Sequence, residues 1–416
     1  MTRSKWPNGS VYPEITCCSS LLILLGFVST SASAVEISAG DWKFTASGNV
    51  NVHYIGARCD DETAPLIDGG LACKGSAGVD HSSSISNGLL PAALAIGAAT
   101  TQKGYDIAVT FGFFPGISTN DGSPNIQQGA DKLNTGLGTT GLDIRQVFMT
   151  FGNESMGEFM LGRNIGLFGA DAILNDMTLP GVGAGSSNYA TPANTSLGSI
   201  GLGYIYTDWL AQINYTTPDI SGFKFTIGIF DPIEPINQSV ATPEKSPGVH
   251  GKLAYKNGPI YVSATVLSLK HEGPTNAGDF DSFGWDIGGK VTFGPAEILA
   301  WYYQGEGLGT TALFFRSDDL NGNERDSDGF LAQATYKFGD LKLGLNYGVS
   351  NLDLASTEIA LLSNLVETNE KYTLGAYYSL TENLTLLAEF TDVHAEAHNG
   401  AENDSSNFNL GAYLSF

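Results

Sequence analysis

Hydrophobic and polar residues alternate along most of the chain, in short segments separated by turn residues. The opening segment, from Trp42 to Tyr54, carries apolar or small residues at every second position and polar residues between them. A period of two is typical of a β-strand with one apolar face and one face in contact with water. The pattern therefore predicts a protein built mainly from amphipathic strands.

The predicted strands occur in pairs joined by short turns, whereas longer, polar and acidic stretches separate one pair from the next. Between a first strand at 42–54 and a last strand at 408–416, the pairs are 90–98 with 105–113, 142–151 with 158–163, 209–216 with 223–230, 249–255 with 260–269, 283–293 with 296–303, 330–338 with 341–349 and 372–380 with 384–391. Short turns alternating with long loops are typical of transmembrane barrels. The sequence therefore predicts an all-β fold, a sixteen-stranded antiparallel transmembrane β-barrel.

The polar face of these strands predicts what lies inside the barrel. Asp286, Lys290 and Thr292 alternate with apolar neighbours, so we expect them to face water in the interior. A polar interior indicates an aqueous lumen instead of a core, and sixteen strands leave an open channel. Closure also pairs every backbone group, as the bilayer requires. A soluble sandwich would alternate too, but it would not normally need so many strands.

Residues 1–34 have the features of a secretory signal. Basic residues precede a short apolar stretch, LLILLGFV, and an Ala-Ser-Ala motif follows it. This order predicts a signal peptide at 1–34 and a mature barrel at 35–416. A lipoprotein is less favoured, because Cys17 and Cys18 precede the apolar stretch. No later segment has the roughly 18 consecutive apolar residues of a spanning helix, which leaves the periplasm, the medium or the outer membrane.

Charge is scarce, at 15% of residues, and its net value is −23. An acidic outer mouth would attract cations, and a basic wall would orient polar solutes. Alternatively, the loops are acidic for solubility and the wall lysines are merely solvated. The loop acids are Asp60, Asp61, Glu62, Asp68, Asp318, Asp319, Glu324, Asp326, Asp328, Glu396, Glu402 and Asp404, and alternation places Lys43, Arg145, Lys224, Lys252, Lys290, Lys337, Lys342 and Lys371 on the lumen face against Asp143, Asp286 and Glu389.

Two cysteines remain after the signal, Cys59 and Cys73. An exported pair usually closes, and a loop of about 15 residues would gain roughly 3 kcal/mol from the bond. Redox chemistry is less favoured, because the chain has no CxxC motif. The run from Asp319 to Asp328 partly resembles a calcium-binding loop, but Glu324 stands where such loops need glycine. We otherwise expect no metal and no cofactor.

Three motifs, in this order, resemble the general diffusion porins of Gram-negative bacteria. They are RQVFMTFGNESMGEFMLGRNIG at 145–166, NYTTPDISGFKFTIGIF at 214–230, and a terminal Phe416 preceded by apolar residues at alternate positions. The resemblance covers essentially all of the predicted mature chain. It implies a homotrimer of sixteen-stranded barrels, in contact with outer-membrane lipid and lipopolysaccharide. It also implies that the outer-membrane assembly machinery reads Phe416 and that a third loop, at about 165–198, folds inward.

The resemblance implies particular residues for the pore constriction. In that family the arginine of the GRN motif belongs to a basic cluster that faces acids on the third loop. Arg163 is therefore the first candidate, with Arg145 and Lys43 on the same basic side. The acidic segment of the family's loop is absent here, so Asp171 and Asp176 are the expected substitutes.

The direction of Arg163 is left open. If Phe159 and Leu161 face lipid, strict alternation places Arg163 on the lipid side as well. Otherwise the strand ends before it, contains a bulge, or turns its aromatic side inward. The alternative role for Arg163 is that of a rim arginine at the membrane interface.

Together these features predict a passive, water-filled outer-membrane channel for small hydrophilic solutes and ions. It is not expected to be an enzyme or to bind nucleic acid. A substrate-specific porin with a saturable site is the first alternative, and a surface adhesin on a barrel scaffold is another. An outer-membrane hydrolase would need a catalytic constellation that the scattered histidines do not supply.

Overall fold

The computed structural model describes residues 34–60, 67–73, 81–117, 142–185, 195–235, 245–273, 278–360 and 363–416. The predicted signal peptide lies outside this part of the chain except for its last residue, as do the loop acids Asp61 and Glu62. The described residues form β-strands and one short helix, α1 (Ala170–Asn175). No helix among them is long and apolar enough to cross a membrane.

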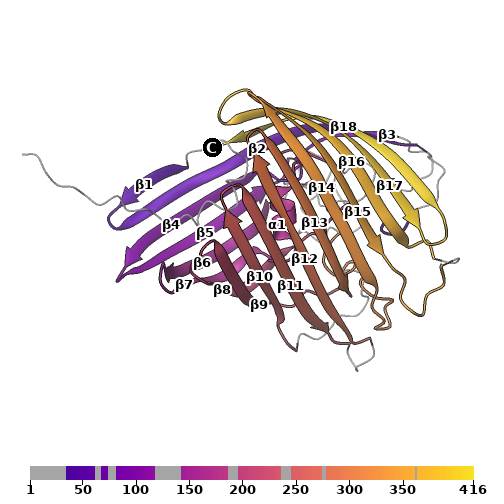
Figure 1. Ribbon diagram of the computed structural model, residues 1–416, viewed down its shortest axis with the longest axis horizontal. Helices are drawn as coiled ribbons and strands as arrows, with labels where there is room; N and C mark the ends of the chain where they lie inside the picture. The colour runs from indigo at the N-terminus through magenta and orange to yellow at the C-terminus, as the bar shows by residue number, and fades with distance from the viewer. Residues whose placement is uncertain are drawn as a thin grey trace, which may run out of the picture.

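The strands follow one another along the chain with turns or loops between them. They are β1 (Val35–Ala39), β2 (Trp42–Cys59), β3 (His81–Ser86), β4 (Ala93–Gln102), β5 (Tyr105–Pro115), β6 (Leu142–Asn153), β7 (Gly157–Ile165), β8 (Trp209–Thr216), β9 (Phe223–Phe230), β10 (Gly248–Asn257), β11 (Ile260–His271), β12 (Phe280–Phe293), β13 (Ala296–Glu306), β14 (Asp326–Phe338), β15 (Leu341–Leu352), β16 (Val366–Ser379), β17 (Leu384–Ala397) and β18 (Glu402–Ser415). Figure 1 shows them tilted side by side in one sheet.

The sheet closes on itself, because each strand from β4 to β17 pairs antiparallel with the next and β18 returns to β2. β3 and β4 pair with successive parts of one edge of β2, while β1 and β18 pair with successive parts of the other edge. Two of the 18 strands therefore share a position with another, which leaves 18 − 2 = 16 positions. The predicted sixteen-stranded antiparallel barrel is confirmed.

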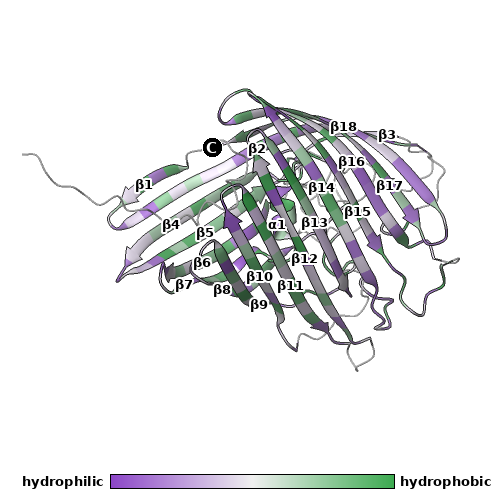
Figure 2. Ribbon diagram, in the orientation of Figure 1, coloured by the Kyte–Doolittle hydropathy of each residue, from purple (hydrophilic) through white to green (hydrophobic). Residues whose placement is uncertain are grey.

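The two faces of the wall differ in polarity as alternation predicted. In β2, Val50 and Val52 are 49% and 42% exposed, whereas Asn49 and Asn51 are each 1% exposed. The same alternation of exposed apolar and buried polar side chains recurs along β12 and β17. Figure 2 shows the resulting bands of hydrophobic and hydrophilic residues along the strands. The outward face is therefore suited to lipid and the inward face to polar contacts.

The structure adds strands that the hydrophobic pattern did not indicate. β3 reads HSSSIS, with one apolar residue, and β1 reads VEISA, which alternates but has only five residues and directly follows the predicted signal peptide. The first strand was predicted to end at Tyr54, but β2 runs to Cys59 because β3 and β18 both pair with its last residues. Backbone pairing, and not side-chain polarity, defines these parts of the wall.

Part of the interior is filled by a hydrophobic cluster. Ile173 and Leu202, from the long connection after β7, pack there with Trp301 of β13 and Leu331 of β14. The expectation of an interior without a core was therefore incomplete. The sequence signal lies in β13, where ILAWYY is apolar on both faces, as is typical of a strand covered on both sides.

Candidate channel constriction

Residues 166–206, which form most of the connection between β7 and β8, contact the inward face of the wall; residues 186–194 of this segment lie outside the described chain. It begins with a turn, enters α1 through Gly169, which has a positive φ of 73°, and continues in tight turns to Gly185. Most of its described residues are buried. Backbone groups in such turns need side-chain partners, and the wall supplies them.

The first anchor is Asp171 of α1, whose side chain is 9% exposed. Its carboxylate accepts hydrogen bonds from Lys252 Nζ at 2.8 Å, Tyr261 Oη at 2.7 Å and Ser263 Oγ at 2.6 Å. Burial acts to raise the pKa of Asp171, but the Lys252 ammonium and the hydroxyl donors outweigh it and hold the pKa below 3.8. The predicted constriction acid is thus bound to β10 and β11.

Two further anchors lie on β12 and β14. The backbone N–H of Gly169 donates to Asp286 Oδ2 at 2.7 Å. The side-chain amide of Gln333 spans the C-terminal end of α1, because its Oε1 accepts from Met177 N at 2.9 Å and its Nε2 donates to Asn175 O at 2.7 Å. Both wall residues stand at buried polar positions of their strands. They satisfy backbone groups at the two ends of the helix.

Asp176, the second predicted acid, holds the segment together internally. Its Oδ1 accepts from Thr178 N at 2.9 Å and Thr178 Oγ1 at 2.8 Å, and its Oδ2 accepts from Tyr204 Oη at 2.9 Å. Burial, followed by the neighbouring Asp176 charge, raises the pKa of Tyr204, which therefore remains a donor. Asp176 thus joins the first half of the segment to the second half.

Another wall anchor is Glu389 of β17, which is 1% exposed. Its Oε2 accepts the backbone N–H groups of Val182 and Gly183, both at 2.8 Å. Gly183 has a φ of +57°, and a Cβ there would lie 2.6 Å from the Cα of Gly198, so only glycine fits. Lys371 of β16 donates from Nζ to Gly198 O at 2.7 Å. The Glu389 carboxylate and the Lys371 ammonium therefore hold the two stretches of the segment that meet here, one at Val182 and Gly183 and the other at Gly198.

The residues between β3 and β4 also hydrogen-bond to the segment. Leu89 N donates to Gly181 O at 2.8 Å, and Ser196 N donates to Gly88 O at 2.9 Å. Asn51 of β2 fixes this stretch, because its Oδ1 accepts from Gly88 N at 2.9 Å. The residues between β3 and β4 therefore connect β2 to the segment.

On its other side the segment borders a cavity of about 280 Å³. The wall of this cavity is formed mainly by the strands from β4 to β7, with Trp209 of β8 and with Thr311 and Ala312 of the β13–β14 connection; none of these supplies the anchors Glu389, Lys371, Lys252 or Asp286. The strand residues include Ala93, Ala95, Phe114, Asp143, Arg145 and Ile165, and the segment contributes Ile173, Leu174, Leu179, Leu197 and Ile200.

Arg145 points into this cavity, on the inward face that alternation predicted for it, and it forms a β-bulge. Between β5 and β6 the register passes from Gly112 opposite Gln146 to Phe113 opposite Ile144, so Arg145 is the extra residue. Its Nε lies 2.7 Å from Asp143 Oδ2, and its guanidinium lies over the Phe114 ring at 5.3 Å. No residue pattern in β6 indicates this bulge beforehand.

Arg163 lies at the rim of the wall. It is the third residue from the end of β7, opposite the exposed Val147 and Ala211, while the next residue, Asn164, bonds to the inward Gln146. The strand therefore neither ends before Arg163 nor brings it to the inward side. Its side chain is exposed and borders the cavity.

A model of the Gram-negative porins matches residues 20–398 of the chain. The chain belongs to the Gram-negative porin family. The fold agrees with solved structures of such porins, and this porin therefore forms an outer-membrane β-barrel channel for passive diffusion. No curated protein matches the sequence significantly.

Three solved structures illustrate the similarity of fold. The outer-membrane channel DcaP of Acinetobacter baumannii is 16% identical, with a TM-score of 0.67 over 91% of this chain and 99% of that one. An anion-selective porin from Comamonas acidovorans is 14% identical, with a TM-score of 0.61 over 90% and 100%. OmpT of Vibrio cholerae, in a trimer form, is 14% identical, with a TM-score of 0.51 over 90% and 99%.

Lys43, the remaining predicted basic residue, lies far along β2 from the anchors of this porin. Its Nζ is 3.2 Å from Glu36 Oε1 of β1, and both side chains are largely exposed. Because β1 was not predicted, this ion pair was not anticipated. Its part in a constriction stays a prediction.

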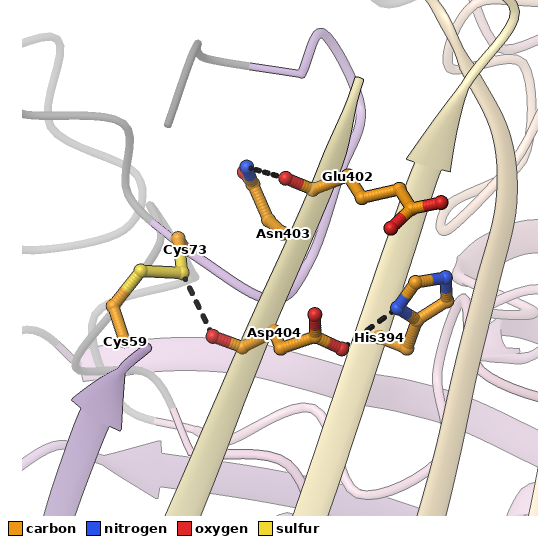
Figure 3. The surroundings of a disulfide bond; sticks show 6 residues. All are labelled: Cys59, Cys73, His394, Glu402, Asn403 and Asp404. Carbon is orange, nitrogen blue, oxygen red and sulfur yellow. Dashed lines mark hydrogen bonds and ion pairs between the residues drawn. A yellow bond between two sulfur atoms is a disulfide. The ribbon is translucent and has the colours of Figure 1, made fainter. Parts of the chain in front are cut away.

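The predicted disulfide joins Cys59, at the end of β2, to Cys73 (Figure 3). Cys73 Sγ also lies 3.3 Å from the backbone oxygen of Asp404 on β18. The stretch before Cys73 is fixed to β16, because Leu71 N donates to Asn369 Oδ1 at 2.9 Å. The bond therefore holds part of the first loop of this porin against the wall.

The C-terminal Phe416 completes the strand position shared by β1 and β18. Its backbone N and O bond with Gly48 of β2 at 3.0 Å and 2.8 Å. Its side chain is 41% exposed and continues the outward row of Phe408, Leu410 and Leu414. A role as an assembly signal stays a prediction.

In the acidic stretch at 318–328, hydrogen bonds from nearby residues hold the carboxylate of Asp319. Asp319 accepts from Asn321 N and Asn323 Nδ2, both at 2.8 Å, and from Thr357 Oγ1 at 2.6 Å. Although burial opposes it, the hydrogen bonds from Thr357 and Asn323 hold the pKa of Asp319 far below 3.8. Among the residues with described positions, no three His, Cys, Asp or Glu side chains gather as a metal site would need. Calcium at the outer loops stays an untested prediction.

Proposed function

We propose that segment 166–206 is the constriction loop of this porin and that solutes pass between it and the strands from β4 to β7. The observation that carries the proposal is that the charged wall groups that anchor the segment all lie on one side of it. Wall groups of β10 to β12, β14, β16 and β17 bond to it, while the cavity lies on the side of β4 to β7. A loop held against one part of a ring narrows the opening and leaves the passage on the other side.

The proposal divides the charged wall residues into two groups with different roles. Lys252, Asp286, Lys371 and Glu389 hold the loop and are covered by it, so they do not act on passing solutes directly. The Asp143–Arg145 pair faces the cavity, and Arg163 borders it at the rim from the outward row of β7. Width and these fixed charges would then select small hydrophilic solutes and ions, without any covalent step.

We further infer that this porin is a homotrimer in outer-membrane lipid and lipopolysaccharide, and that the assembly machinery recognises its C-terminal strand. The trimer form of the similarly folded OmpT supports the first inference. The outward apolar row that ends at Phe416 supports the second.

Removal of the Lys252 ammonium tests the role of the loop. Lys252→Met leaves the Asp171 carboxylate buried without its cation, and breaking such a pair costs about 3 kcal/mol or more. We expect the loop to detach transiently, so that single-channel recordings in planar bilayers show frequent conductance jumps.

Lys337→Met is the matched control. It removes the same charge from the wall, and Lys337 makes no hydrogen bond or ion pair with the segment in the described chain. Equal recordings from the two variants would contradict the proposal.

A substrate-specific porin remains the second candidate. One observation favours it: the cavity is lined by apolar side chains as well as by charges. A passage for hydrated ions alone does not need such a lining.

A further inference from the structure

The cavity beside the segment combines a compact size with an apolar lining. Its volume of about 280 Å³ equals that of about nine water molecules at roughly 30 Å³ each. Leu90 and Ala95 line it from the wall side, and Leu174 and Leu179 line it from the segment. Water in such a space lacks partners on most sides, so an apolar group that displaces it gains free energy.

The acids at this cavity already have partners. Asp143 Oδ2 accepts from Arg145 Nε at 2.7 Å. Asp208 Oδ1 accepts from the backbone N–H of Trp209 at 2.6 Å, and burial raises the pKa of Asp208 despite that bond. Neither carboxylate is therefore placed to attract a cationic solute strongly.

Several donors at the same cavity lack an acceptor. The exposed guanidinium of Arg163 makes no hydrogen bond or ion pair within the described chain, and Thr311 Oγ1 is buried without a partner. Tyr206 Oη accepts from Trp209 Nε1 at 2.6 Å, but its own proton goes to no described residue. A surplus of donors over acceptors favours a ligand that brings acceptor atoms and negative charge.

We infer that this cavity is a saturable binding site for a small organic carboxylate with a compact apolar body. The carboxylate is received by the hydroxyls of Tyr206 and Thr311 within the field of Arg163, and the apolar body lies between Leu90 and Leu174. The inference rests on the proposed function, since the site would lie in the passage. Such a site would let the channel select small organic carboxylates by their chemistry, in addition to selecting solutes by size.

The test uses benzoate as the probe in planar-bilayer recordings of the whole porin. Benzoate is expected to reduce the chloride-salt current in a saturable way. Acetate, which has the charge without the ring, and benzylammonium, which has the ring with the opposite charge, are expected to reduce it far less. Benzamide separates the contribution of the ring from that of the charge.

Two conservative variants assign the site. Thr311→Val and Tyr206→Phe keep the shape of the side chain and remove one donor each. Each is expected to raise the half-blocking benzoate concentration roughly threefold to tenfold. Tyr378→Phe, which removes a hydroxyl from an outward side chain that is 45% exposed, is the control and should leave the block unchanged.

The outcomes separate this inference from the channel proposal. A normal current with equal, non-saturable effects of all four probes overturns the binding site and leaves the channel standing. A saturable benzoate block that is unchanged in both donor variants also overturns this assignment. Absence of any current from the assembled porin overturns the channel and the site together.

Discussion

The two sides of segment 166–206 have different surroundings. Toward β10–β18 the segment meets buried charges, and each of these charges ends on a backbone or side-chain group of the segment, as Glu389 does on Val182 and Gly183. Toward β4–β7 it meets leucines, alanines and aromatic rings around a cavity. One side is a closed polar network, and the other is an open, mostly apolar space.

This difference shows that a charged residue on the lumen face of a porin strand need not contact the solute. Lys252 and Arg145 both occupy inward positions, but the first is covered by α1 and the second borders the cavity. Alternation predicts the inward direction of both side chains. Only the path of the long connection determines which of them acts on the passage.

The largest effect is expected where the network is densest. Glu389→Ala leaves two buried backbone N–H groups without their acceptor, and each bond to a carboxylate contributes about 1.5–3 kcal/mol. We expect continuous conductance fluctuation and digestion of the segment by added protease. Glu297→Ala, which removes a wall carboxylate whose partner is Lys290 at 3.6 Å, should leave both properties unchanged.

A smaller effect is expected from the close approach of two glycines. Gly183→Ala forces a methyl group to 2.6 Å from Gly198 Cα at a φ of +57°, whereas Gly339→Ala has a φ of +59° and no neighbour within 4 Å. The backbone strain is similar, about 1–2 kcal/mol in each case. Gly183→Ala should therefore disturb the conductance while Gly339→Ala lowers only the unfolding temperature, and equal conductance in both variants would argue against the crowded turn.

Acid should release the Asp171 anchor only below pH 3.8. The folded-state pKa of Asp171 lies below this ordinary value, because Lys252 and two hydroxyls outweigh the effect of burial. The contact therefore contributes fully above pH 3.8 and is lost as the pH falls through the lower folded value. Recordings across this range should show conductance jumps at acidic pH in the parent, and Asp171→Asn should show them already at pH 7. Equal recordings from the parent and Asp171→Asn at pH 7 would contradict the assignment.

The smallest effect is expected at Arg163. Its position at the rim and its exposure mean that Arg163→Ala should shift the reversal potential in a salt gradient slightly, through the loss of one screened charge. Arg145→Ala removes a buried charge beside the cavity and should shift the potential more. The reverse order would place Arg163, and not Arg145, at the narrowest point.

The sequence predicted the wall well because each strand carries its own signal. Alternation and short turns located the hairpins, and the strands missed in the described chain were the serine-rich β3, which does not alternate, and β1, whose alternation covers only five residues. The disulfide between Cys59 and Cys73 was also predictable, because only two cysteines follow the predicted signal peptide.

The site was predicted less well because it depends on contacts distant in sequence. Asp171 lies 81 residues from Lys252, and Val182 lies 207 residues from Glu389. No local pattern encodes these pairs. The bulge at Arg145 changes which residues of β6 face inward from Gln146 onward, and a strict period of two cannot anticipate this change.

The most direct test of the account compares two introduced thiols. Ala95→Cys lies on β4 at the cavity, and Asn346→Cys lies on β15, where the side chain of Asn346 is fully buried and points toward Asp176 across 3.4 Å. A charged, water-soluble thiol reagent added during single-channel recording should reduce the current of Ala95→Cys within minutes and leave that of Asn346→Cys unchanged. Rapid modification of Asn346→Cys, with Ala95→Cys inert, would place the passage on the opposite side of the segment and contradict the account.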